Sequence, residues 1–218
     1  VLVVNNFWGD IRIRQTGGSE ASVQAVMQKI GSQPKVARLH SSQDGKRIVV
    51  SIEYPAEQEP SSPREGRVDA VILLPYANAV EVHSGRGRVI TKTLESPLTV
   101  TAKDAPIQIK SRGVVNVSTQ SSPVDFLLLA KKENDGSSSA PSRIQSIDCD
   151  IEIRYSKDQA ISVEIISGAS KSTNDLMLLQ SRKKEGRKVL MQKGIEPVHI
   201  SLQSDTGRII LTDISAEH

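Results

Sequence analysis

The stretch VEVHSGRGRVITKTLESPLTVTAKDAPIQIKSRGVVNVSTQSSPVDF, residues 80–126, contains the same apolar pair three times. In each copy six residues separate the two apolar side chains, and the pairs are Val82/Val89, Val100/Ile107 and Val117/Val124. Residues seven positions apart on a straight strand point to opposite faces of a sheet. If both members of a pair face one core, the chain must therefore turn between them.

Turn-forming residues stand inside every interval of this kind. Two further pairs with the same separation, Val4/Ile11 and Leu202/Ile209, surround NNFWGD and QSDTGR. Glycine stands two positions before the second apolar residue in three copies, and proline stands one position before it in the other two. Strand interiors reject both residue types. Each interval therefore predicts a strand, a corner and a second strand, with Gly9, Gly87, Gly207, Pro106 and Pro123 in the corners.

The pairs also recur along the chain at a longer period. Val82 precedes Val100 by 18 positions, and Val100 precedes Val117 by 17. A strand–corner–strand unit that returns at this interval is typical of stacked repeats, in which each unit covers the apolar face of the next. We expect an all-β fold, a single-stranded β-helix-like solenoid of short stacked strands, with a β-sandwich as the alternative.

The rest of the chain divides at a serine-rich segment. We expect a β-repeat solenoid region over residues 1–130, a flexible loop over 131–143, and further β-repeats over 144–218 that stack on the same solenoid. KRIVVSIEY (46–54) and RVDAVILLP (67–75) alternate as strands. Residues 19–31 allow two interpretations. Val23, Val26, Met27 and Ile30 share one helical face, and the same residues also fit an irregular strand.

Composition excludes several classes of function. The net charge of +3 is small for 218 residues, so the pI near 9.0 does not identify a nucleic-acid binder, and aromatic residues at 3% leave few platforms for base stacking. Cys149 is the only cysteine, which excludes an internal disulfide and a thiolate metal cluster. No apolar run is long enough to span a bilayer. The chain begins at Val1 without methionine, which leads us to expect that a leader or lipid anchor has been removed.

Two stretches resemble a known family. VNNFWGDIRIR opens the chain, and VDAVILLPYANAVEVHSGRGRVITKTLESPLTVTAKDAPIQIKS leads into the repeats. Both are similar to the bacterial β-strand-repeat family of putative adhesins, a domain family of unknown function. The second stretch matches the family's entry pattern at Leu74, Pro75, Val80, Val82, Ser84, Gly85, Gly87 and Val89.

The resemblance covers about the first 130 residues well and ends loosely with SDTGRIIL. It implies an exported, envelope-associated β-helix-like solenoid and supplies no catalytic residues. The chain departs from the family pattern in its corners. Of the aspartates that often follow the turn glycine, only Asp10 is retained, and Arg88 and Arg208 occupy the equivalent places.

The acidic pair Asp148 and Asp150 is the candidate for catalysis. If these residues lay on a strand, both carboxylates would point the same way, as the acids of β-helix polysaccharide hydrolases and lyases do. A polar face of an edge strand explains the same pattern. We therefore predict a protein that is not an enzyme, with a carbohydrate-active enzyme as the alternative.

Two basic clusters are candidates for holding phosphate or carboxylate groups. The first consists of Arg86 and Arg88 in SGRGR, and bidentate arginine suits such anions. A solvated hairpin with Glu-Gly in its turn is the favoured interpretation over anion binding. The second cluster comprises Arg182, Lys183, Lys184, Arg187 and Lys188.

The histidines and the aromatic pair carry weaker expectations. His40, His83, His199 and His218 lie far apart in sequence and near no other ligand at metal spacing, so we expect no metal site and no cofactor. Phe7 and Trp8 are interpreted as closing an open end of the stack, with contact to a sugar as the alternative.

The function expected from these features is that of a non-enzymatic, exported, periplasmic or cell-surface scaffold, an adhesin or a binding or assembly surface. Solenoids create long surfaces of this kind. An envelope glycan, lipid or protein is the expected partner, and an anionic lipid or glycan bound through the basic clusters is the third alternative. An exposed end of the solenoid also leaves a strand edge that can pair with a second copy of the chain, so we expect that a homodimer can form.

Overall fold

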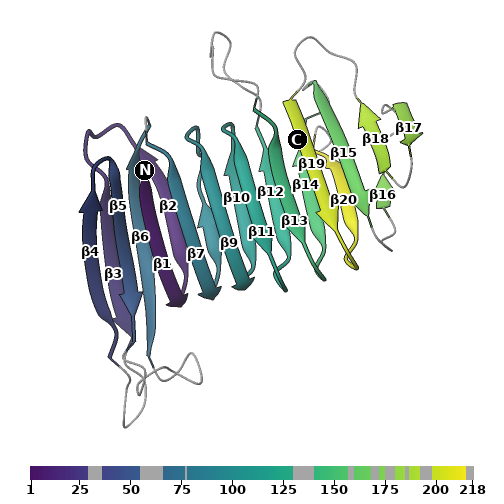
Figure 1. The fold of residues 1–218 in the computed structure, drawn as a ribbon. Coiled ribbons are helices and arrows are strands. Elements are labelled where there is room, and N and C mark those ends of the chain that lie inside the picture. Colours follow the sequence, from purple (N-terminus) through teal and green to yellow (C-terminus); the bar gives the residue numbers. More distant parts are fainter. Residues whose placement is uncertain are drawn as a thin grey trace.

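The computed structural model describes residues 1–28, 36–54, 66–76, 78–129, 140–156, 160–167, 172–174, 180–184, 187–191 and 198–214. All regular elements in these ranges are β-strands, which form two mixed sheets (Figure 1). The all-β prediction is confirmed. Two facing sheets around a shared core are also compatible with the β-sandwich alternative.

Sheet A has eleven strands. In spatial order they are β17 (Gln180–Lys184), β18 (Arg187–Met191), β15 (Ile161–Ser167), β19 (Val198–Ser204), β13 (Ser142–Ser146), β11 (Val115–Thr119), β9 (Leu98–Asp104), β7 (Val80–Arg86), β1 (Leu2–Trp8), β5 (Arg47–Glu53) and β4 (Arg38–Asp44).

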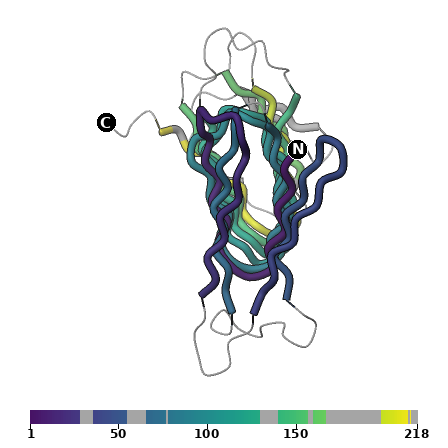
Figure 2. The backbone as a smooth tube through the Cα atoms, turned by 90° about the vertical axis from the view of Figure 1, so that its left-hand side faces the viewer, coloured from purple at the N-terminus to yellow at the C-terminus, as the bar shows by residue number. Residues whose placement is uncertain are grey.

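Sheet B has nine strands. In spatial order they are β16 (Ser172–Asn174), β20 (Ile209–Asp213), β14 (Ile151–Tyr155), β12 (Val124–Leu128), β10 (Ile107–Ser111), β8 (Val89–Thr91), β2 (Ile11–Thr16), β6 (Arg67–Pro75) and β3 (Ser22–Gln28). Seen along the stack, the two sheets form two facing layers (Figure 2).

Six pairs of strands connect the sheets through corners whose residues are all described, and we call them corner-linked pairs. In each pair a strand of sheet A runs into a corner and continues as a strand of sheet B. These pairs are β1/β2, β7/β8, β9/β10, β11/β12, β13/β14 and β19/β20. Neighbouring pairs are parallel in both sheets, as the repeat interval requires.

The seven-residue pairs of the sequence form two buried ladders. Val4, Val82, Val100, Val117 and Leu202 occupy one register position in sheet A, with Ile144 between Val117 and Leu202. Their partners occupy one position in sheet B: Ile11, Val89, Ile107, Val124, Ile151 and Ile209. All these side chains belong to one core, and each contributes about 1.5–3 kcal/mol to the free energy of folding.

Backbone hydrogen bonds continue the ladder through the corners. The N–H of the second apolar residue of a pair donates to a carbonyl group in the neighbouring pair, with N–O distances of 2.8–3.0 Å. This carbonyl belongs to the residue directly before the second apolar residue of that neighbouring pair. The donors and acceptors are Ile11 and Arg88, Val89 and Pro106, Ile107 and Pro123, Val124 and Asp150, and Ile151 and Arg208.

The spatial order of the strands departs from the chain order at both ends. β1 lies between β5 and β7, because strands β3, β4, β5 and β6 form the end of the two sheets beyond β1 and β2 (Figure 1). At the other end β19 lies between β13 and β15. The first and last corner-linked pairs of the chain are therefore interior members of the stack.

Residues 22–28 form strand β3, which decides between the two interpretations of this segment. β3 runs antiparallel to β6, with Val23 opposite Ile72 and Met27 opposite Val68. Val23 and Met27 face the core, whereas Val26 on the other face is 61% exposed. Side chains of a strand alternate between its two faces, which explains this placement. The helical interpretation is wrong. Ile30 lies outside the described residues.

The serine-rich segment lies mostly outside the described residues, since 130–139 are not described. β13 begins at Ser142, inside the segment predicted as a loop. β11, which precedes the segment, pairs directly with β13, which follows it.

Candidate binding groove

Six polar side chains lie in register on the outer face of sheet A. Each directly follows the first apolar residue of a seven-residue interval, and because neighbouring residues of a strand point to opposite faces, each points away from the core. The strands that carry them are β1, β7, β9, β11, β13 and β19. We call them the polar row: Asn5, His83, Thr101, Ser118, Gln145 and Gln203.

The polar row borders a groove of about 730 Å³ that crosses the strands near their corners. Residues two positions further along the chain, in the strands or just past their ends, line it as well: Phe7, Gly85, Lys103, Gln120, Ile147 and Asp205. Most of the lining side chains carry hydroxyl, amide or apolar groups, and one lysine and one aspartate are included. The groove therefore combines hydrogen-bonding groups with a larger apolar surface and carries little net charge.

Side-chain contacts within sheet A hold part of this lining in place. Gln145 Nε2 donates to Gln203 Oε1 at 3.4 Å, and Asn5 Nδ2 donates to Ser51 Oγ at 2.9 Å. His83 Nε2 lies 2.8 Å from Oε1 of Glu81. Side chains that are positioned by such contacts lose less rotamer freedom when a ligand binds.

Phe7 forms an apolar border at one end of the groove. It is 40% exposed, and a Cβ atom added to Gly85 would lie 2.6 Å from Phe7 Cδ2. Glycine at this position therefore lets the ring pack against the backbone of β7. Trp8 points inward and is 4% exposed, with the Arg86 guanidinium 4.7 Å from the centre of its ring.

The prediction that Phe7 and Trp8 close an open end is wrong. They lie on β1, and β5 and β4 lie beyond β1 in the same sheet. Nothing in the sequence indicated that residues 17–79 would be placed outside the first pair. Of the two rings, only Phe7 has the surface needed for contact with a sugar.

A second hollow of about 530 Å³ continues along the outer face of sheet A. Gln145 and Gln203 belong to both hollows, and Arg143, Glu164 and His199 line the second one. The two hollows together follow sheet A from β1 to β15.

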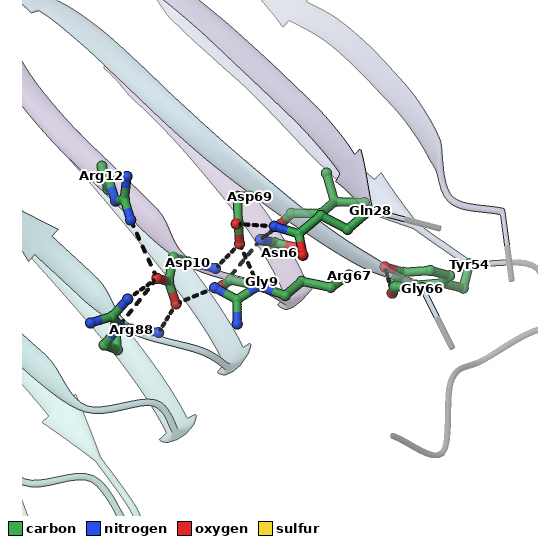
Figure 3. Close-up of polar contacts among 11 residues, drawn as sticks. Asn6, Gly9, Asp10, Arg12, Gln28, Tyr54, Gly66, Arg67, Asp69 and Arg88 are labelled. Carbon is green, nitrogen blue, oxygen red and sulfur yellow. Dashed lines mark hydrogen bonds and ion pairs between the residues drawn. The ribbon is translucent and has the colours of Figure 1, made fainter. Parts of the chain in front are cut away.

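Arg88, a candidate for binding anions, already holds a carboxylate of the protein (Figure 3). Its backbone N–H donates to Asp10 Oδ1 at 2.9 Å, and its Nε and Nη2 donate to Asp10 Oδ2 at 3.1 and 2.7 Å. Arg67 Nη2 contacts the same carboxylate at 2.9 Å, and the Asp10 side chain is 2% exposed. Arg86 lies 3.6 Å from Asp104 as well as against Trp8.

The charged groups around Asp10 determine its titration. Burial alone would raise the pKa of Asp10, but the hydrogen bonds from Arg88 and the positive charges of Arg67 and Arg88 outweigh it, so the pKa lies below its ordinary value. Asp69 extends the cluster, because its Oδ1 accepts the Asp10 backbone N–H at 2.8 Å and its Oδ2 accepts Gln28 Nε2 at 2.9 Å (Figure 3).

Asp148 and Asp150 lie in the corner between β13 and β14, so the assumption that they share a strand face is wrong. Asp150 accepts three hydrogen bonds from Arg208, from its backbone N–H at 2.8 Å, Nε at 3.1 Å and Nη2 at 2.6 Å. These bonds lower the pKa of Asp150. Asp148 Oδ2 accepts Ser121 Oγ at 3.4 Å. The enzyme hypothesis stays a prediction.

The second basic cluster lies on the hairpin of β17 and β18. The backbone register places Arg182 opposite Val189, Lys183 opposite Lys188, and Lys184 opposite Arg187. β15, β19, β13, β11 and β9 separate this hairpin from β7, which carries Arg86. The fold therefore does not bring the two basic clusters together.

The histidines lie on separate strands of sheet A. His40 is on β4, His83 on β7 and His199 on β19, and His218 is outside the described residues. Within the described ranges there is no group of three or more His, Cys, Asp or Glu side chains that could hold a metal ion. The same ranges contain no helix with the length and apolar character to cross a membrane.

Comparison with solved structures finds one that shares the fold and a second that matches more weakly. The chain superimposes on a "putative cell adhesion protein" from Clostridium sporogenes with a TM-score of 0.52 at 14% identity, over 97% of this chain and 92% of the other. A "putative adhesin" from Bacteroides fragilis gives a TM-score of 0.35 at 12% identity, over 96% and 91% of the chains. No protein-family model and no curated protein matches the sequence.

The polar row is the feature that sequence reasoning missed. The signal was present, because the residue after the first apolar member is polar in every pair: Asn5, His83, Thr101, Ser118 and Gln203. Only the register of the strands turns these scattered positions into one line.

Proposed function

We propose that the protein is a non-enzymatic, exported scaffold of the adhesin type that binds an extended glycan along the polar row. The observation that carries the proposal is the register of six polar side chains beside one groove. A polymer that lies across the strands meets similar side chains on each of them. Contacts that are individually weak then add along its length.

The proposal includes a solenoid architecture. The parallel register of the corner-linked pairs and the two apolar ladders support it, since both repeat from one pair to the next. In such a stack the outer face of sheet A is a long surface whose length is set by the number of pairs. An extended ligand suits this shape better than a compact one.

The chemistry of the groove favours a glycan that carries little charge. Amide and hydroxyl groups both donate and accept hydrogen bonds, as sugar hydroxyl groups require. Lys103 and Asp205 are the charged residues of the lining, and their charges are opposite. A strongly acidic polymer would instead require several arginine or lysine side chains. Phe7 supplies an exposed ring on which a sugar can stack.

One structural neighbour supports the adhesin part of the proposal. The Clostridium sporogenes protein, which shares the fold, is described as a "putative cell adhesion protein". A surface or periplasmic location is consistent with binding an envelope glycan.

Binding to an array of neutral and acidic glycans tests the proposal. Ser118→Trp places a bulky side chain in the middle of the groove, on an exposed position of β11. Gln108→Trp is the matched control, because Gln108 is exposed on β10 in sheet B. We expect wild type and Gln108→Trp to retain neutral glycans and Ser118→Trp to lose them, with both variants melting near the wild-type temperature.

Two results would contradict the proposal. The first is a wild-type protein that binds none of the arrayed glycans. The second is equal retention by Ser118→Trp and Gln108→Trp, which would place the binding surface elsewhere.

A second candidate function is binding of an anionic lipid or glycan by the β17–β18 hairpin. The register of this hairpin, which sets Lys183 opposite Lys188 and Lys184 opposite Arg187, favours it. Replacing Arg182, Lys183 and Lys184 with glutamine should then abolish retention on heparin or acidic liposomes. Unchanged retention would remove this candidate.

A further inference from the structure

Among the described strands, β4 is the last of sheet A, and one of its edges has no strand beside it. It pairs with β5 on one side and is the last strand of the sheet on the other. All seven of its residues are exposed, and Leu39 is 54% exposed. A strand of this length with one free edge is a template for pairing with another strand.

The sequence of β4, RLHSSQD, is complementary to itself when it is read in the opposite direction. An antiparallel pair of two β4 strands centred on Ser41 aligns Arg38 with Asp44, Leu39 with Gln43 and His40 with Ser42. Among symmetric registers, only this one pairs all seven residues. It is also the one that sets Arg38 of each copy opposite Asp44 of the other.

The charges of β5 extend this match. In the register of the hairpin Glu53 lies opposite Arg38, and Arg47 lies opposite Asp44. Across the join, one face therefore carries a row of alternating sign: Glu53, Arg38, then Asp44 and Arg47 of the second copy. Opposite charges at facing positions stabilise neighbouring strands. A parallel pair in the same register would instead align like charges, Arg38 with Arg38 and Asp44 with Asp44.

We propose that two copies of the chain associate through their β4 strands, antiparallel and symmetric about Ser41, so that their two A sheets become one. The association is isologous, because each copy contributes the same strand. The outer faces of the two A sheets then lie on the same side of the joined sheet. If the proposed glycan-binding function holds, the dimer carries two grooves on one face and gains from multivalent binding.

Sedimentation of two charge-reversal variants tests the interface. Arg38→Asp sets aspartate opposite Asp44, and Asp44→Arg sets arginine opposite Arg38, so each variant alone is expected to sediment as a monomer where the wild type is a dimer. In an equimolar mixture both acidic positions of the first variant face basic positions of the second, so the mixture is expected to form dimers again. Circular dichroism checks that both variants retain the β fold.

Cysteine cross-linking checks the register. In a Cys149→Ser background, Ser41→Cys faces its own copy across the two-fold axis and is expected to form an intermolecular disulfide under mild oxidation. Gln43→Cys is the matched control, because Gln43 is opposite Leu39 and not opposite itself. A wild type that is monomeric at the highest attainable concentration, a mixture that stays monomeric, or equal cross-linking of both cysteine variants would overturn the proposal. None of these readouts depends on glycan binding.

Discussion

Arg88 donates three hydrogen bonds to Asp10 across the corners of two neighbouring corner-linked pairs. Asp150 and Arg208 repeat this arrangement in the corners of β13/β14 and β19/β20, with donor–acceptor distances that agree within 0.1 Å. Asp10 and Arg88, and likewise Asp150 and Arg208, occupy the same corner position in adjacent pairs. If all four positions held aspartate, negatively charged carboxylates would lie next to one another and repel. Arginine in the next pair replaces this repulsion with attraction and so stabilises the corner.

Proline occupies the same corner position in two pairs, β9/β10 and β11/β12, and the pair before each of them has no carboxylate at that position. The backbone N–H groups of Arg88 and Arg208 donate to an aspartate of the preceding pair. Pro106 follows Arg88 in the stack, and Pro123 follows Pro106. Neither Pro106 nor Pro123 follows a carboxylate that could accept a backbone N–H, and proline has no backbone N–H to donate. Proline therefore fits these two positions, and Asp150, which follows Pro123 in the stack, shows that such a position also accepts another residue.

Asp10→Ala should destabilise the protein much more than Asp150→Ala. The Asp10 side chain is 2% exposed and its removal leaves Arg67 and Arg88 without their shared carboxylate, whereas the Asp150 side chain is 39% exposed. We expect a loss of about 3 kcal/mol for Asp10→Ala. For Asp150→Ala we expect less than about 1 kcal/mol. Urea unfolding of both variants measures the difference, and equal losses would contradict the role assigned to burial.

The stability contributed by Asp10 should disappear in acid. Its pKa in the folded protein is below the unfolded value, so its contribution is fully present above about pH 4 and is lost as the pH falls through the folded pKa. Asp10→Asn removes this titration. The difference in melting temperature between wild type and Asp10→Asn should therefore be largest near neutral pH and should shrink below about pH 4. A constant difference down to about pH 2 would show that Asp10 acts without its charge.

Val100→Asp should prevent stable folding, because it buries an unpaired charge in the middle of the sheet A ladder. Val100 is 0% exposed and has Val82 and Val117 on either side. We expect a loss of more than about 4 kcal/mol. Thr99→Asp, on the exposed face of the same strand, is the control and should change stability by less than about 1 kcal/mol. Thermal melting of Val100→Asp at the wild-type temperature would contradict the ladder.

Gly87→Ala should destabilise the corner after β7. Gly87 has a φ of +114°, and an added Cβ atom would lie 2.2 Å from the carbonyl oxygen of Gly9. The expected loss is about 2 kcal/mol or more, from backbone strain and from the displaced neighbouring corner. Gly17→Ala is the control, since an added Cβ atom there meets nothing within 4 Å. Chemical unfolding that finds the two variants equally stable would be evidence against a tight corner.

The ladders could be predicted from sequence because the spacing of Val and Ile records both the corner and the repeat. The pair Ile144/Ile151 has the same spacing and was not recognised. It follows Val117 by 27 positions instead of 17 or 18, since the serine-rich segment interrupts the period. Asp148 and Asp150 also suggested a strand where the chain forms a corner.

The order of the pairs in space could not be predicted. Sequence periodicity gives the length of a unit and says nothing about a segment that leaves the stack and returns. Residues 17–79 place β5 and β6 beyond β1 and β2, and β15 likewise lies beyond β19. The groove was missed for the same reason, because its side chains are neighbours only once the strands are paired. The unpaired edge of β4 is a product of this rearrangement too.

Interior placement of the first and last pairs leaves the middle of the molecule free to change in length. One more unit of 17 or 18 residues inserted between β10 and β11 would add a strand to each sheet and displace the two ends by about 4.8 Å. Neither end would need to be rebuilt. The length of both sheets is therefore adjustable by gene duplication in single-strand steps.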